Sequence, residues 1–150
     1  MVRTGELVWV SGAVGIDADG RVPANVVDQF KVAVQNIDQC LRAAGGGPEH
    51  VVKLNIYLTD ISDRAAINPE RIRYFGEHRP ASTLVQVGAL VAPELKVEIE
   101  AQAFISGACS GATAPRASPS RQVRLRQLAL SRNRLWGQNG CYRLICQLHT

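Results

Sequence analysis

The sequence of 150 residues lacks long apolar runs and contains few aromatic residues, with three Phe, three Tyr and two Trp. No apolar run approaches the roughly 18 residues that a membrane-spanning helix needs. The N-terminus also lacks the basic start and the apolar stretch of a signal peptide. These absences argue against a membrane protein and against an exported protein, so we expect a soluble cytoplasmic protein with no membrane contact.

Acidic residues are absent from the last 44 residues, and this absence divides the chain in two. Residues 1–106 contain 10 Lys and Arg against 13 Asp and Glu, a net charge of −3. Residues 107–150 contain 7 Arg and no acid, a net charge of +7, and the two parts sum to the +4 of the whole chain. Because residues 107–120 are rich in Gly, Ala, Ser and Pro, they are typical of a linker. We predict one compact domain over 1–106 and a basic, flexible extension over 107–150.

The extension offers two candidate partners, and neither pattern is specific. Seven arginines attract nucleic acid electrostatically, but Trp136 and Tyr142 are the only aromatic residues among them, so a nucleic-acid partner is not favoured. Cys141, Cys146 and His149 match no common zinc spacing, and a fourth ligand would have to come from the distant linker. We therefore expect no zinc site in the extension.

The most regular pattern in the first hundred residues predicts a helix over 26–44. Apolar side chains recur there at spacings of three and four, which places them on one face. Asn25 suits the N-cap, and the glycines from Gly45 to Gly47 suit the end of the helix.

Strand patterns cover 6–16, 51–60, 83–90 and 95–105. The first of these strands is expected to end at Ser11 and Gly12. A second helix is predicted from about Pro69 to His78, since proline is favoured in a first turn. This order of elements predicts an α+β fold in which both helices pack on one face of a sheet.

The other face of the predicted sheet mixes apolar side chains with Asn55, Tyr57, Glu98 and Glu100. In a monomer this face would lie in water. Alternatively, it packs against other subunits and lines a polar cleft between them. Residue spacing alone leaves both interpretations open.

Six stretches follow one another in the order of a known family: GELVWVSGAVGIDADGRV, LRAAGG, VVKLNIYLTD, AAIN, RPAS and VEIEAQAF. From Gly5 to Ile105 the chain resembles the Rid (YjgF-type) family, whose members include reactive-intermediate deaminases. The resemblance implies a chorismate-mutase-like α+β fold with a mixed β-sheet, and a homotrimer with clefts between subunits. It also implies hydrolysis of imine or enamine products of pyridoxal-phosphate enzymes, with release of ammonia and without a cofactor or metal.

The resemblance assigns roles to five residues. Ser11 and Gly12 match a Ser-Gly pair that offers a hydroxyl and a backbone N–H to the ligand. Asn68 matches an asparagine that lines the cleft, and Leu84 falls where many members carry a small residue or cysteine. Glu98 matches the catalytic glutamate that positions water or handles a proton.

Ser82 departs from the family. Active deaminases carry an arginine at this position, whose planar guanidinium grips the substrate carboxylate with two parallel hydrogen bonds. A serine hydroxyl donates only one neutral hydrogen bond, and the loss of such a contact costs about 2–5 kcal/mol of binding. Arg79 lies three residues earlier and is expected to face solvent. The sequence therefore predicts poor activity on simple 2-imino acids and a preference for neutral or differently anchored substrates.

A second departure lies at the N-terminus, where only four residues precede Gly5. The N-terminal strand of the family, with a tyrosine that helps to close the cleft, is expected to be missing or shortened.

Two functions remain open from the sequence. The first is a Rid-family hydrolase or deaminase that acts on a small imine, enamine or amide-like metabolite. The second is a non-catalytic trimer that binds metabolites or partner proteins.

Overall fold

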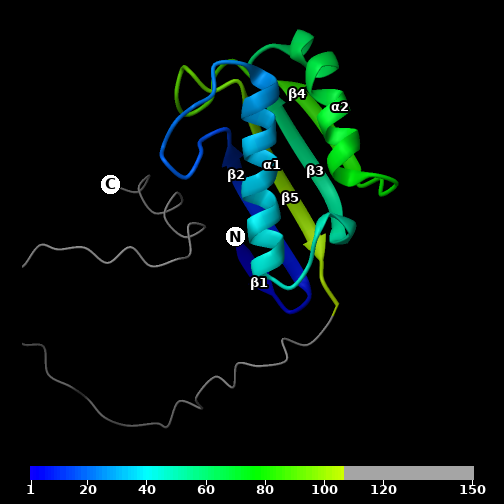
Figure 1. The fold of residues 1–150 in the computed structure, drawn as a ribbon. Helices are drawn as coiled ribbons and strands as arrows, with labels where there is room; N and C mark the ends of the chain where they lie inside the picture. The colour runs from blue at the N-terminus through cyan, green and yellow to red at the C-terminus, as the bar shows by residue number, and fades with distance from the viewer. Residues whose placement is uncertain (107–150) are drawn as a thin grey trace, which may run out of the picture.

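The structure is a computed structural model that describes residues 1–106 (Figure 1), so the predicted extension lies outside the described residues. Five strands form one sheet in the order β1-β2-β5-β3-β4. They are β1 Val2–Thr4, β2 Leu7–Val14, β3 Val51–Leu58, β4 Ala81–Gln86 and β5 Val97–Phe104. In this part of the chain β3 and β4 pair in parallel, and the other neighbours pair antiparallel. The sheet is therefore mixed, as predicted.

The first helix, α1, spans Val26–Ala43 and has both of its predicted ends. The Asn25 side chain accepts a hydrogen bond from the backbone N–H of Asp28 at 2.8 Å, which caps the helix start. At the other end, Gly45 adopts a φ of 81°, and the N–H groups of Gly45 and Gly46 donate to carbonyls of the last turn. This reversal suits glycine because its left-handed backbone conformation carries no Cβ penalty.

The second helix, α2, spans Arg64–Phe75 and begins five residues before the predicted start at Pro69. A short 3₁₀ turn, η2 (Ile61–Asp63), leads directly into it. Pro69 lies inside the helix, where its missing N–H removes one backbone hydrogen bond without breaking the helix. Asn68 is therefore a residue inside α2 and does not precede the helix, as a start at Pro69 would imply.

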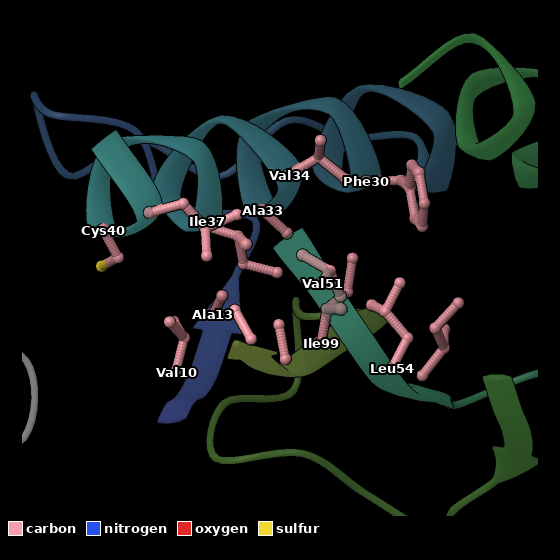
Figure 2. Packing of buried hydrophobic residues seen from close by; sticks show 14 of the residues in the cluster. Val10, Ala13, Phe30, Ala33, Val34, Ile37, Cys40, Val51, Leu54 and Ile99 are labelled. Atoms are coloured by element: carbon pink, nitrogen blue, oxygen red, sulfur yellow. The ribbon is translucent and has the colours of Figure 1, made fainter. Parts of the chain in front are cut away.

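Both helices cover the same face of the sheet (Figure 1). Figure 2 shows side chains of α1 above the strand side chains that point toward it. From the strands, the buried residues of this core include Val8, Val10, Leu54, Ile56, Leu58, Val97, Ile99, Ala101 and Ala103. From α1 they include Phe30, Ala33, Val34, Ile37 and Leu41. None of the helices within residues 1–106 is both long enough and apolar enough to span a bilayer.

A buried glutamine links α1 to the loop before β5. The side chain of Gln29 donates to the carbonyls of Pro23 at 2.8 Å and Glu94 at 2.9 Å, and it accepts from the Lys96 N–H at 2.7 Å. All three bonds provide partners for backbone carbonyl or N–H groups in loops, which would otherwise have none. A Cβ added to Gly15 would lie 2.5 Å from the Gln29 Cβ, so only glycine leaves room for this side chain.

Strand β2 contains a bulge that its sequence pattern does not predict. Its register with β5 shifts between Val10 and Ala13, where β2 has one residue more than its partner. Ser11 and Gly12 lie in this bulge, and Gly12 has a φ of 67°. The strand then continues to Val14, so the prediction that it ends at Ser11 and Gly12 is wrong. Pairing with β5 resumes after the bulge and extends the strand.

Strand β4 also lies earlier than predicted, at Ala81–Gln86 and not at 83–90. It pairs in parallel with β3, from Lys53 beside Ala81 to Leu58 beside Gln86. Because β3 ends at Leu58, β4 has no neighbouring strand beyond Gln86.

Candidate functional site

Glu98 lies on the open face of the sheet, which we define as the face turned away from the two helices. Its neighbours along β5, Val97 and Ile99, are buried under the helices, so the alternation of the strand turns Glu98 the other way. The β2 bulge approaches the carboxylate closely, since a Cβ on Gly12 would lie 3.6 Å from Glu98 Oε1. Ser11, beside it in the bulge, is exposed. Bulges often re-aim side chains next to active sites.

The Glu98 carboxylate is half-buried. Burial raises its pKa above the ordinary glutamate value, and the nearby charge of Glu100 raises it further. Within residues 1–106 its oxygens accept no hydrogen bond, so they are available to a ligand or to water. A carboxylate with a raised pKa that faces open space is suited to proton transfer.

Glu100 has a different environment on the same face. Its Oε2 accepts hydrogen bonds from the Tyr57 hydroxyl at 2.9 Å and from the Asn55 amide at 3.2 Å. The hydrogen bond to Glu100 raises the pKa of Tyr57, and burial adds to the effect. This cluster fixes Glu100 in place beside Glu98.

A second group of candidate residues lies on the helix side of the sheet, at the β4 edge. Ser82 pairs with Leu54 and Leu84 with Ile56, so both candidates point toward the helices. They line a cavity of about 270 Å³ between β4 and α2. The lining residues are Ile56, Arg64, Ile67, Asn68, Arg71, Ser82 and Leu84.

The six predicted site residues therefore fall into two groups. The structure brings Ser11, Gly12 and Glu98 together on the open face, and it brings Asn68, Ser82 and Leu84 together beside α2. The sheet lies between the two groups within one chain. A single subunit does not join them into one site.

Two arginines of this cavity, Arg64 and Arg71, were not found from the sequence. Together with Ile67 and Asn68 they have the spacing i, i+3, i+4, i+7, which is typical of one helix face. This pattern was hidden because the predicted helix began at Pro69. Arg79, by contrast, is exposed, and its guanidinium donates to the Gly76 carbonyl outside the cavity.

Comparison with known proteins assigns the chain to a family. The family described as Endoribonuclease L-PSP matches residues 1–105. The chain belongs to this family, the YjgF/Rid family. The predicted resemblance is thereby confirmed.

Solved structures of the YjgF/Rid family share this fold. A member of the YjgF/YER057c/UK114 family from Mycobacterium tuberculosis is 37% identical, with a TM-score of 0.63, and the match covers 69% of this chain and 82% of that one. Escherichia coli TdcF, solved with bound serine, is 34% identical with a TM-score of 0.66, and the match covers 70% and 85%. The α+β fold with two helices on one mixed sheet is thus the fold of the family.

A relative named for its activity is 2-iminobutanoate/2-iminopropanoate deaminase from Capra hircus. It is 42% identical over 96 residues, which make up 63% of this chain and 69% of that protein.

Proposed function

We propose that this YjgF/Rid chain hydrolyses a small imine, or an enamine after its protonation on carbon, or a related amide-like metabolite. Water adds to the C=N carbon, and the resulting carbinolamine expels ammonia to leave a carbonyl compound. An imine carbon is already electrophilic, so the site needs only to orient the substrate, deliver water and transfer protons. Protein side chains can carry out each of these steps.

The observation that carries this proposal is the environment of Glu98. Its carboxylate is half-buried, faces open space beside the β2 bulge and has a raised pKa. We assign it the removal of a proton from the attacking water. Ser11 and Gly12 form this bulge, and we assign the Ser11 hydroxyl and the Gly12 backbone N–H to ligand binding.

A complete site requires a neighbouring subunit in this proposal. In a homotrimer, the open face of one subunit would lie against the β4 edge of the next, which brings Glu98 to the cavity of Ser82. The open face supports such an interface because it exposes large apolar side chains, as surfaces that bind partners do. These are Val2, Leu7, Trp9 and Phe104, which are 63%, 43%, 38% and 45% exposed.

The names of the relatives agree with this chemistry. The goat relative is named as a deaminase of 2-imino acids, and TdcF binds serine, an amino acid of similar size. The family description also names an endoribonuclease. RNA binding depends on cationic contacts to phosphates, and residues 1–106 carry a net charge of −3, so the described domain does not favour RNA as its substrate.

The test is the rate at which the full chain hydrolyses 2-iminobutanoate or 2-aminoacrylate generated in the assay, with semicarbazide competing for the same intermediate. Glu98→Gln should lower kcat/KM by roughly 10²- to 10⁴-fold, the usual range for a lost acid–base residue. Glu94→Gln removes an exposed acid in the loop before β5 and serves as the matched control.

Wild-type activity in Glu98→Gln would remove its catalytic role. If no imine or enamine is turned over while the chain still binds small metabolites, the function is that of a non-catalytic binding protein.

A further inference from the structure

We propose that the cation missing from β4 is supplied by α2: Arg71, assisted by Arg64, holds the carboxylate of the substrate in the Ser82 cavity. This inference rests on the proposed function because it names the substrate class of the same site. It makes the substrate a small 2-imino acid or a related carboxylate, and it revises the preference for neutral substrates that was predicted from Ser82 alone.

The face of α2 that meets the cavity carries both arginines. Arg64, Ile67, Asn68 and Arg71 lie on one face of the helix, since residues three, four and seven apart are neighbours there. Ile67 is buried in the core, so this face is the one turned to the sheet. All four residues line the cavity together with Ser82.

The Arg71 guanidinium is held in a defined orientation. Its Nε and Nη2 both donate to Asn68 Oδ1, at 3.2 and 3.0 Å. A guanidinium has five N–H donors, so three remain for a ligand. Asn68 is therefore a positioning residue for Arg71, and a pre-oriented planar fork suits a carboxylate with its two oxygens.

The charges of the two cavity arginines have no partner within the described domain. Arg21, Arg42 and Arg73 each form an ion pair with a carboxylate. In residues 1–106 neither Arg64 nor Arg71 has an acidic group within ion-pair distance, and the cavity lining contains no acid. An anionic ligand would neutralise this charge.

Arg64 also lies at the end of α2 where a positive charge is unfavourable. It is the first residue of α2, and the first turn of α2 contains no acid. Cations are unfavourable at a helix N-terminus because the backbone dipole is positive there. An anion bound between the two arginines would remove this conflict.

The rest of the cavity restricts the size of the ligand. Its volume of about 270 Å³ lies below the range of about 300–1,000 Å³ that holds drug-sized molecules. Ile56, Ile67 and Leu84 provide an apolar wall for a short alkyl group. Ser82 is short, so it leaves room for Arg71 at the position where a strand-borne arginine would crowd it.

The test is calorimetric binding of 2-oxobutanoate, a stable carbonyl analogue, compared with the uncharged 2-oxobutanamide. We expect the wild-type full chain to prefer the carboxylate. Arg71→Gln should weaken 2-oxobutanoate binding about 10- to 100-fold, and Arg64→Gln by a smaller factor, with no change for the amide. Arg71→Lys should not restore binding, because an ammonium lacks the planar fork. Arg73→Gln, on the same helix but outside the cavity, should bind as the wild type does.

Two results would overturn the proposal: equal wild-type affinity for the acid and the amide, or unchanged 2-oxobutanoate binding in the Arg64→Gln/Arg71→Gln double variant. Thermal melting of each variant separates a lost contact from a lost fold. Binding of an unreactive keto acid does not require Glu98 chemistry. If Arg71→Gln loses this binding while the wild type turns over no imine, the anion site stands and the deaminase proposal fails.

Discussion

Gly12 and Glu98 lie so close together that a single methyl group on Gly12 would come within 3.6 Å of Glu98 Oε1. The β2 bulge thus forms one wall of the space in front of the carboxylate. Glycine keeps this space open, and its φ of 67° lies in a region that other residues rarely adopt.

Replacement of this glycine should therefore affect activity more than stability. We expect Gly12→Ala to lower the free energy of unfolding by about 1–2 kcal/mol, the usual cost of a left-handed non-glycine residue. We also expect kcat/KM for imine hydrolysis to fall at least about tenfold, since the added methyl group would occupy space beside the carboxylate that water and substrate need. Gly20→Ala is the matched control because Gly20 has a φ of 80° but no atom within 4 Å of an added Cβ. Equal loss of activity in both variants would contradict a specific role of the bulge.

The pH profile provides a test of Glu98 as the base. The carboxylate form is active, so kcat/KM should fall as the pH is lowered through the raised pKa of Glu98. Part of this increase in pKa comes from the negative charge of Glu100. Glu100→Gln removes that charge, so the pKa of Glu98 should fall and the acid limb should move to lower pH. An acid limb that does not move, in a variant that still turns over substrate, would show that another group titrates.

The same carboxylate should oppose folding at neutral pH. Because the pKa of Glu98 is higher in the folded chain than in the unfolded chain, its contribution to stability is present at low pH and is lost as the pH rises through the folded pKa. Glu98→Gln should therefore raise the Tm at pH 7 more than at pH 4. A variant that is less stable than the wild type at both pH values would indicate a structural role instead.

Gln29 should be important for stability and not for chemistry. Gln29→Met keeps the side-chain size but leaves the Lys96 N–H and the carbonyls of Pro23 and Glu94 without their partner. Each unsatisfied buried group costs about 1–3 kcal/mol. We therefore expect the free energy of unfolding, measured by chemical denaturation, to fall by at least about 2 kcal/mol. Gln39→Met, at an exposed position of the same helix, should change little. A loss below about 0.5 kcal/mol in Gln29→Met would show that water satisfies these groups.

Assembly through the open face can be tested at Trp9. A charge at this position would be buried in the proposed interface, so Trp9→Glu should reduce the molar mass measured by light scattering from that of a trimer to that of a monomer. Ile72→Glu places the same charge at a comparably exposed position on α2, where 49% of Ile72 is accessible, and should leave the trimer intact. A wild-type chain that is monomeric at all concentrations would exclude a site formed between the open face of one subunit and the β4 edge of the next.

The parts of the fold that were predicted from the sequence are those that depend on local spacing. The apolar stripe and the caps of α1, and the alternation in β3 and β5, depend on residues that are close in sequence. The structure confirms these elements. The start of α2 was missed because Pro69 is a common first-turn residue, whereas here η2 leads into a helix that begins earlier.

The arrangement of the site was harder to predict because it depends on pairing between distant strands. The parallel register of β4 with β3 turns Ser82 toward the helices, and the antiparallel register of β5 leaves Glu98 on the other face. Neither register is visible in the spacing of either strand. Arg71 was missed for a related reason, since its contact with the cavity depends on how α2 packs beside β4.

The sheet separates Glu98 from Arg71 within one chain. If the two residues meet between subunits, variants of the two residues should complement each other. Chains that carry Glu98→Gln and chains that carry Arg71→Gln would each have strongly reduced activity alone. A mixed trimer of the two variants would contain some intact sites. In each of these sites the Arg71→Gln chain would provide Glu98 and the Glu98→Gln chain would provide Arg71. A turnover rate after co-refolding that exceeds the rate of either impaired variant alone is therefore the behaviour that this layout entails.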